Sequence, residues 1–156
     1  MKNARLTILV ALAFTAALSA AAIAQSNGAE VYKRCIGCHK STGQGVPGYA
    51  PPLASHIPNV EKSPDGRTYL IQVLLYGLKG KILVNGQPFD ATMPAFGDLN
   101  DGEAAAVLNR ILTNWGNDIL LPKDHKAIAP EEVAAQRKNK LTAEQVREIR
   151  GKLGLK

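Results

Sequence analysis

The two cysteines of this 156-residue chain are three positions apart, in the stretch Cys35-Ile36-Gly37-Cys38. A disulfide between them would close a very small loop and add little stability, because the gain grows with loop length. Redox-active pairs of this spacing follow a strand, whereas the residues before Cys35 already have a helical pattern. A structural zinc site needs four ligands, and the sequence has no second cysteine pair. The remaining use for the two thiols is covalent attachment of a group.

His39 follows the second cysteine directly and completes the pattern C-x-x-C-H, the attachment signature of c-type haem. Within a helical turn, a spacing of three places both sulfurs on one face, where they can form thioethers with the two vinyl groups of the macrocycle. The imidazole of the next residue then lies under the iron. The motif therefore predicts one covalent haem c, with Cys35 and Cys38 as attachment points and His39 as the proximal metal ligand.

The first 24 residues have the pattern of a signal peptide. Lys2 and Arg5 supply the positive end, an apolar run follows over 6–22, and a small-x-small site ends at Ala24. An uncleaved anchor helix is the alternative, since the run is almost long enough to span a bilayer. We expect cleavage, which leaves 25–156 as an exported, periplasmic chain without a stable membrane span.

The second axial ligand decides what the haem does, because an open position permits gas or peroxide chemistry and a firm ligand restricts the iron to electron transfer. Once the leader is removed, Met93 is the only methionine. A lone methionine is usually core filler. However, Pro94 biases Met93 toward an extended backbone, and the 54 residues that separate it from His39 suffice to reach the opposite haem face. We predict Met93 as the sixth ligand.

Two other histidines could compete for that position. His56 precedes Pro58 in a proline-rich loop and is expected to be solvated, and His125 belongs to a basic tail. Neither has a context that favours iron ligation.

Charge divides the exported chain into two parts. Residues 25–118 carry 8 basic and 8 acidic side chains, whereas 119–156 carry 9 basic and 5 acidic ones, a net charge of +4. Export and the lack of an aromatic-basic face argue against a nucleic-acid partner. We therefore expect a haem domain over 25–118 and a basic, partly helical extension over 119–156.

The elements that must position the site can be predicted from periodicity and end signals. A first helix is expected over 29–38, followed by a loop rich in glycine and proline over 41–58. A second helix, from residue 65 or 67 to 78, has an apolar stripe at i, i+3, i+4 and i+7. Residues 81–89 predict a short strand and an Asn-Gly turn. The stripe consists of Ile71, Leu74, Leu75 and Leu78.

End signals also predict the last core helix and two helices in the tail. Asn100, with Glu103 three residues later, starts the core helix, and Gly116 can end it. In the tail, Pro130 opens one helix, and a capping box at 142–145 with a hydrophobic staple opens another. The tail can be a solvated appendage or a docking arm for an acidic partner. The inward stripe of the core helix is Ala104, Val107, Leu108, Ile111 and Trp115.

Taken together, the motifs resemble those of a class I cytochrome c of the small bacterial kind. The resemblance covers roughly 28–117: the attachment motif at 35–40, the loop Ala-Pro-Pro-Leu at 50–53, the ligand motif Met-Pro-Ala-Phe at 93–96, and a helix through 104–108. It implies a mainly α fold in which short helices surround one covalently attached haem, with a small hairpin before the methionine loop.

The resemblance also implies roles for individual residues. The carbonyl of Pro52, or alternatively of Pro51, accepts the other N–H of the proximal histidine, which fixes the orientation of the imidazole. Leu53 packs on the haem. The first and last helices cross, so Tyr32 should pack near 108 and 111, unless it covers the haem edge instead.

The expected function is one-electron transfer by an exported carrier with His39 and Met93 as axial ligands. The chain would pass electrons between a dehydrogenase and an oxidase, or act as the haem subunit of a dehydrogenase complex. It is not expected to be an enzyme. A haem enzyme or a gas-binding sensor with an exchangeable axial site is the alternative.

Overall fold

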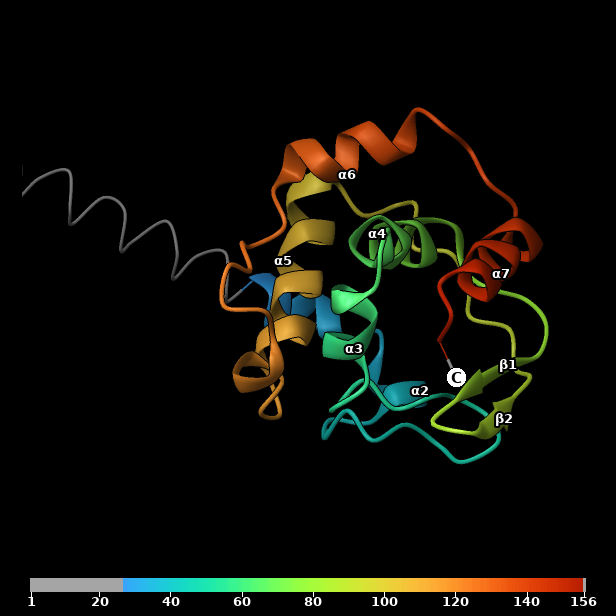
Figure 1. Cartoon of the computed structure of the whole chain (residues 1–156). Helices are drawn as coiled ribbons and strands as arrows, with labels where there is room; N and C mark the ends of the chain where they lie inside the picture. The colour runs from blue at the N-terminus through green and yellow to red at the C-terminus, as the bar shows by residue number, and fades with distance from the viewer. Residues whose placement is uncertain (1–26, 156) are drawn as a thin grey trace, which may run out of the picture.

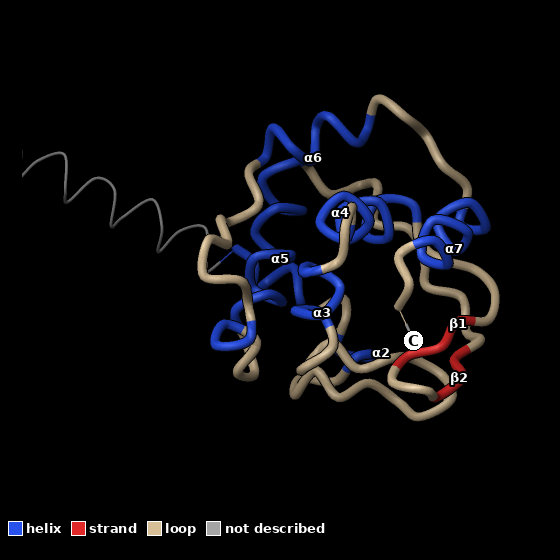
Figure 2. Tube along the Cα trace, viewed as in Figure 1, coloured by secondary structure: helices blue, strands red, loops and turns tan. Residues whose placement is uncertain are grey.

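The computed structural model describes residues 27–155, and the expected signal peptide at 1–24 lies outside them. The described part is mainly helical with one small sheet, which confirms the predicted fold class (Figures 1 and 2). None of its helices is long and apolar enough to cross a membrane. Residues 27–32 are helical. The elements after them are α2 (Ile36–His39), α3 (Ile57–Lys62), α4 (Gly66–Tyr76), β1 (Ile82–Val84), β2 (Gln87–Phe89), α5 (Asp101–Thr113), η1 (Asp118–Leu120), α6 (Pro130–Arg137) and α7 (Ala143–Lys152).

The first helical segment crosses α5 in direct backbone contact, as expected. A Cβ at Gly28 would collide with the backbone carbonyl of Ala106, so only glycine permits this approach. The expected helix over 29–38 is interrupted by turns at 33–35 and continues as α2.

Tyr32 fixes the end of this segment against the region after α5. It is buried in the same cluster as Leu108 and Ile111. Its ring centroid lies 5.2 Å from that of Trp115, and its hydroxyl donates to the Lys40 carbonyl at 2.8 Å. Trp115 itself has a φ of 57° beyond the end of α5, so its assignment to the helical stripe was wrong.

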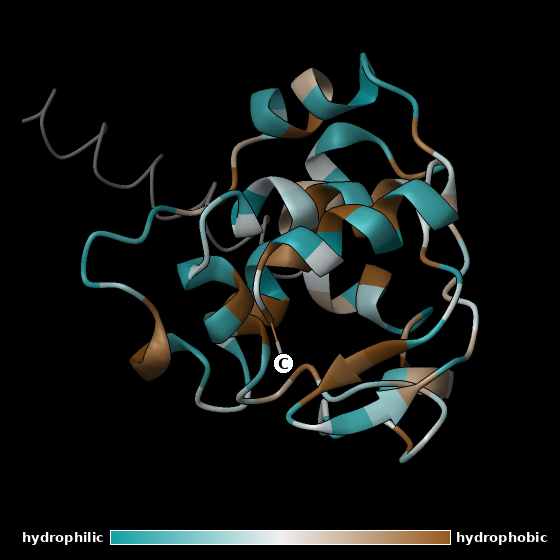
Figure 3. Cartoon of the chain, turned by 45° about the vertical axis from the view of Figure 1, so that its right-hand side comes forward, coloured by the Kyte–Doolittle hydropathy of each residue, from teal (hydrophilic) through white to brown (hydrophobic). Residues whose placement is uncertain are grey.

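The second helix and the hairpin follow the prediction. α4 buries the predicted stripe residues at 71, 74 and 75, but it ends at Tyr76, so the fourth stripe residue, Leu78, is buried beyond the end of the helix. β1 and β2 pair antiparallel around Asn85 and Gly86, which both have positive φ, at 52° and 76°. This is the backbone of a type I′ turn, whose twist matches that of the flanking strands. β1 is apolar, whereas β2 begins with the polar Gln87 (Figure 3).

The last core helix begins as predicted but ends earlier. The Asn100 side chain accepts from the Glu103 N–H, and the Glu103 carboxylate accepts from the Asn100 N–H, both at 2.9 Å. α5 ends at Thr113, three residues before Gly116, because Asn114 has an extended backbone.

The loop expected over 41–58 ends in a helix that was not predicted. Pro58 lies in the first turn of α3, where its fixed φ favours a helix and no N–H is needed. Val60 is 1% exposed, so the short helix is anchored in the core. His56 precedes α3 and is only 4% exposed. The expectation of a solvated His56 was therefore wrong, because the chain turns inward where α3 begins.

The tail packs onto the core and is not a solvated appendage. α6 lies against α5 and α4, and α7 lies against α4 (Figure 1). Val133 of α6 and Val146 of α7 are fully buried and belong to the central hydrophobic cluster. Both helices begin at the predicted residues, and Thr142 caps α7 through the N–H of Gln145.

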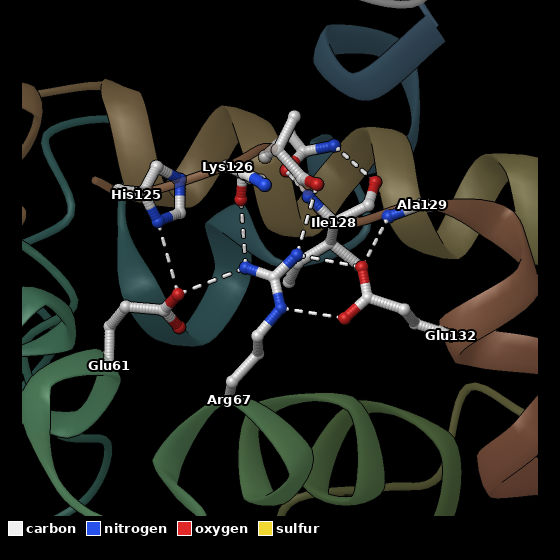
Figure 4. Close-up of polar contacts among 9 residues, drawn as sticks. Glu61, Arg67, His125, Lys126, Ile128, Ala129 and Glu132 are labelled. Carbon is white, nitrogen blue, oxygen red and sulfur yellow. Dashed lines mark hydrogen bonds and ion pairs between the residues drawn. The ribbon is translucent and has the colours of Figure 1, made fainter.

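Arg67 of α4 holds the start of the tail (Figure 4). Its guanidinium donates to both carboxylate oxygens of Glu132 at 2.7 Å and to the backbone carbonyls of Lys126 and Ala127 at 2.8 and 3.0 Å. It also pairs with Glu61 at 3.0 Å. One side chain of the core thus bonds to several points of the tail.

Candidate functional site

The attachment motif lines one wall of a large cavity. Cys35, at the N-cap of α2, is buried, Cys38 is half-buried, and both are free thiols. Burial is the main reason that the pKa of Cys35 is raised to about 11. A thiol with so high a pKa is a poor nucleophile for disulfide exchange. Within 27–155 no group of three or more His, Cys, Asp or Glu side chains could hold a metal ion.

His39 is oriented by the loop that follows it. Its Nδ1 lies 2.9 Å from the carbonyl oxygen of Pro51, so Nδ1 donates and Nε2 is free to act as a ligand. Burial lowers the pKa of His39, which favours the neutral ring that ligation needs. The cavity lies beside this ring.

The acceptor is Pro51, and its assignment to Pro52 was wrong by one position. Successive carbonyls of an extended chain point to opposite sides, so only one of the two can face the imidazole. Ala50, immediately before Pro51, is paired with Val46 in an isolated β-bridge. This pairing fixes the direction of the backbone at Ala50 and therefore decides that the Pro51 carbonyl faces the imidazole. Pro52 still lines the cavity, as does the buried Leu53.

Met93 lies on the same cavity and is held by backbone pairing. Its N–H donates to the Leu78 carbonyl at 2.9 Å, and its carbonyl accepts from the Leu78 N–H at 3.0 Å. Gly77 has a φ of 75°, and a Cβ there would collide with the Met93 carbonyl. The methionine loop thus runs tightly along the end of α4, which sets the position of the Met93 side chain.

Both the turn before α2 and the tail hold the chain just after Met93. Arg34 pairs with Asp98 through two hydrogen bonds of 2.8 and 3.1 Å, and its guanidinium lies 4.9 Å from the Phe96 ring centroid. From α6, Arg137 donates to the carbonyls of Gly97 and Leu99.

Two cavity residues were not found by sequence reasoning. His56 and Arg150 both line the cavity, whereas His125 pairs with Glu61 at 3.1 Å, away from it. A signal for Arg150 existed in its spacing, since it lies four residues after Val146 and therefore on the buried face of α7.

The cavity encloses about 1260 Å³ of empty space, its open mouth included. Its walls are mainly apolar, with two thiols and a neutral histidine on one side and a thioether from the methionine loop. These residues fit a large apolar macrocycle that carries an iron and is attached through two thioether bonds.

This combination of fold and donor set defines a c-type haem protein. Residues 25–115 match the family model for cytochrome c. The chain belongs to the cytochrome c family, as a class I bacterial member, and it binds a covalently attached haem c with its iron.

Known relatives fall into two groups. One cytochrome c-552 of Thermus thermophilus is 49% identical over 139 residues, which cover 89% of this chain and 93% of that protein. The gluconate 2-dehydrogenase cytochrome c subunit of Pantoea cypripedii is 43% identical over 94 residues, 58% of this chain but 20% of that protein. The quinone-dependent alcohol dehydrogenase cytochrome c subunit of Gluconacetobacter polyoxogenes is 37% identical over 93 residues, 58% of this chain and 19% of that protein. The similarity to the Thermus cytochrome c-552 covers 139 residues of this chain, whereas only 118 residues precede the tail. This similarity therefore includes part of the tail.

Proposed function

We propose that this electron carrier binds its iron between His39 and Met93 and exchanges electrons with redox proteins outside the cytoplasm. The observation that carries the proposal is the shared cavity, lined by the attachment motif and by Met93 from a separate loop. When bound, haem c supplies a reversible one-electron change at its iron.

The residues of the chain perform four tasks in this function. Cys35 and Cys38 fix the macrocycle, and the Pro51 carbonyl keeps the proton of His39 on Nδ1, which leaves Nε2 for the iron. Met93 supplies a thioether, which favours the reduced iron and raises the potential. The apolar walls limit the access of water. Two firm axial ligands leave no open position for substrate, so we infer that the chain itself is not an enzyme.

We propose that 1–24 is a cleaved signal peptide and that the chain works in the periplasm. The pattern of its first residues supports this.

We propose a dehydrogenase as electron donor and an oxidase as acceptor, or association with a dehydrogenase as its haem subunit. Two of the relatives are named as cytochrome c subunits of dehydrogenases, which supports a partner of this class. We further propose that the haem domain (25–118) and the extension (119–156) act as one folded unit, because the hydrophobic cluster contains residues of both.

The axial ligands are tested by replacing Met93→Ala. The variant should keep its covalent haem, lose the sulfur-to-iron charge-transfer band of the oxidised protein, bind CO, and have a lower potential. Axial ligands can move haem potentials over about 0.8 V. His56→Asn, which removes the competing cavity histidine, should retain the band. A Met93→Ala protein that keeps the wild-type potential and does not bind CO would exclude Met93 as a ligand.

A further inference from the structure

Arg34 lies at the mouth of the haem cavity, directly before the first attachment cysteine. It lines the cavity, and its side chain is 44% exposed. Its guanidinium donates to both carboxylate oxygens of Asp98, at 2.8 and 3.1 Å, and lies 4.9 Å from the ring centroid of Phe96. The turn at 33–35 is therefore linked to the chain three and five residues after Met93.

The contacts of Arg34 have the geometry in which an exposed ion pair is effective. Most exposed pairs stabilise a protein little, because two flexible side chains must be ordered in water. Here a planar guanidinium bonds to the Asp98 carboxylate through two hydrogen bonds. The same group lies over the ring of Phe96, which is only 8% exposed and whose N–H donates to the Leu74 carbonyl at 2.9 Å. Arg34 therefore contacts a fixed point of the chain after Met93.

The segment after Met93 has little buried surface of its own. Of residues 94–98 only Phe96 is buried, and the other four are exposed. Such a segment can open locally at a much lower free-energy cost than unfolding of the whole protein. From the tail, Arg137 donates to the carbonyl of Gly97, and Arg34 contacts the segment from the side of the attachment motif. Opening of the segment should therefore depend strongly on these two side chains.

We propose that Arg34 is a positioning residue for Met93, and that its ion pair with Asp98 sets how often the second axial position of the iron opens to small ligands from solution. This inference rests on the proposed ligation by Met93. The backbone of Met93 stays paired with Leu78 on one side, so the freedom of its thioether depends on the segment that follows. The pair with Asp98 restrains that segment.

The exposure of the pair gives the proposal an electrostatic signature. Salt screens interactions between exposed charges, whereas it does not weaken the packing of a buried ring in the same way. Opening of segment 94–98 should therefore become more frequent in the wild type as the ionic strength rises. In Arg34→Gln, which lacks the charge, the frequency of opening should not depend on salt.

Hydrogen exchange of the Phe96 N–H in the oxidised holoprotein measures this opening. Arg34→Gln should raise the exchange rate about three- to tenfold at low salt and should speed imidazole binding to the iron by a similar factor. The midpoint of urea unfolding should stay unchanged, because the pair is exposed. Lys33→Gln is the matched control, since Lys33 is the neighbouring exposed cation and pairs with Glu30 at 2.6 Å. It should alter neither rate.

A double-mutant cycle assigns the effect to the pair. Asp98→Asn should give part of the effect of Arg34→Gln, and adding it to Arg34→Gln should change nothing further, because the partner is already absent. Wild-type exchange in Arg34→Gln would overturn the proposal, as would faster exchange that follows only from a lower urea midpoint. Faster exchange without faster imidazole binding would also overturn it. The charge-transfer band, which Met93→Ala should lose, tests the ligation separately from this positioning role.

Discussion

At the scale of single residues, the members of the attachment motif differ in their surroundings. Cys35 is buried and its thiol pKa is raised, whereas Cys38 and the exposed Ile36 lie nearer to solvent. A thiol with a raised pKa is less reactive toward oxidation and disulfide exchange.

Replacing either cysteine with serine should sharply reduce covalent haem, because each sulfur forms one of the two thioethers. Cys35→Ser and Cys38→Ser should stain weakly for haem on a denaturing gel, and the double variant should not stain. Ile36→Ala changes the motif without removing a sulfur and should stain normally. Normal staining of the double variant would show that attachment occurs elsewhere.

At the scale of elements, α6 depends on charge as well as on apolar packing. Hydrogen bonds from Arg67 are the main reason that the pKa of Glu132 is lowered. A carboxyl whose folded pKa lies below its unfolded value stabilises the protein above the unfolded pKa, and this contribution is lost as the pH falls through the folded pKa. The ion pair between α4 and α6 should therefore weaken only at a pH below the range in which an ordinary glutamate titrates.

Glu132→Gln tests this contribution. The variant should unfold at lower urea concentration than the wild type near pH 7, and the difference should shrink at acid pH, where the wild-type carboxyl is protonated. Glu131→Gln is the matched control, since it lies in the same helical turn but is exposed. An equal loss in both variants would mean that the helix dipole, and not Arg67, accounts for the effect.

At the scale of the whole molecule, the tail contacts both the methionine loop and the segment after α4 that pairs with it. Arg137 of α6 bonds to carbonyls after Met93, and the Ala143 carbonyl at the start of α7 accepts from the Lys79 N–H at 3.2 Å, just after α4. The same segment buries Val133 and Val146 completely. Its basic charge is therefore carried by helices that support the haem pocket.

Truncation after Asp118 should destabilise the protein and weaken Met93 ligation. Each fully buried aliphatic side chain contributes about 1.5–3 kcal/mol, which is large relative to the roughly 5–15 kcal/mol of net stability of a domain. Guanidinium unfolding, followed by the charge-transfer band, measures the loss. The exposed pair Lys138→Gln and Lys140→Gln should leave stability unchanged and alter only the salt dependence of electron transfer. A truncated protein with wild-type stability would contradict the role of the tail.

The sequence by itself determined the cofactor and the local elements of this protein. The C-x-x-C-H motif can be recognised from the sequence alone, because its three reactive side chains lie within one short segment of the chain. The helix starts at Asn100, Pro130 and Thr142 and the turn at Asn85 also depend on neighbouring residues alone, and the structure has all four. The assignment of Met93 as an axial ligand remains a prediction from the sequence, based on the loop in which Met93 lies and on its distance along the chain from His39.

Only the tertiary structure decided which distant groups meet. The carbonyl that accepts from His39 belongs to Pro51 and not to Pro52, because the bridge between Val46 and Ala50 fixes the direction in which the following carbonyls point. The periodicity of the sequence carries no information on that direction. His56 and Arg150 are 94 residues apart, and each has an ordinary local context for a surface residue. They face one cavity because α7 folds back onto α4, driven by buried apolar residues that are far apart in the sequence.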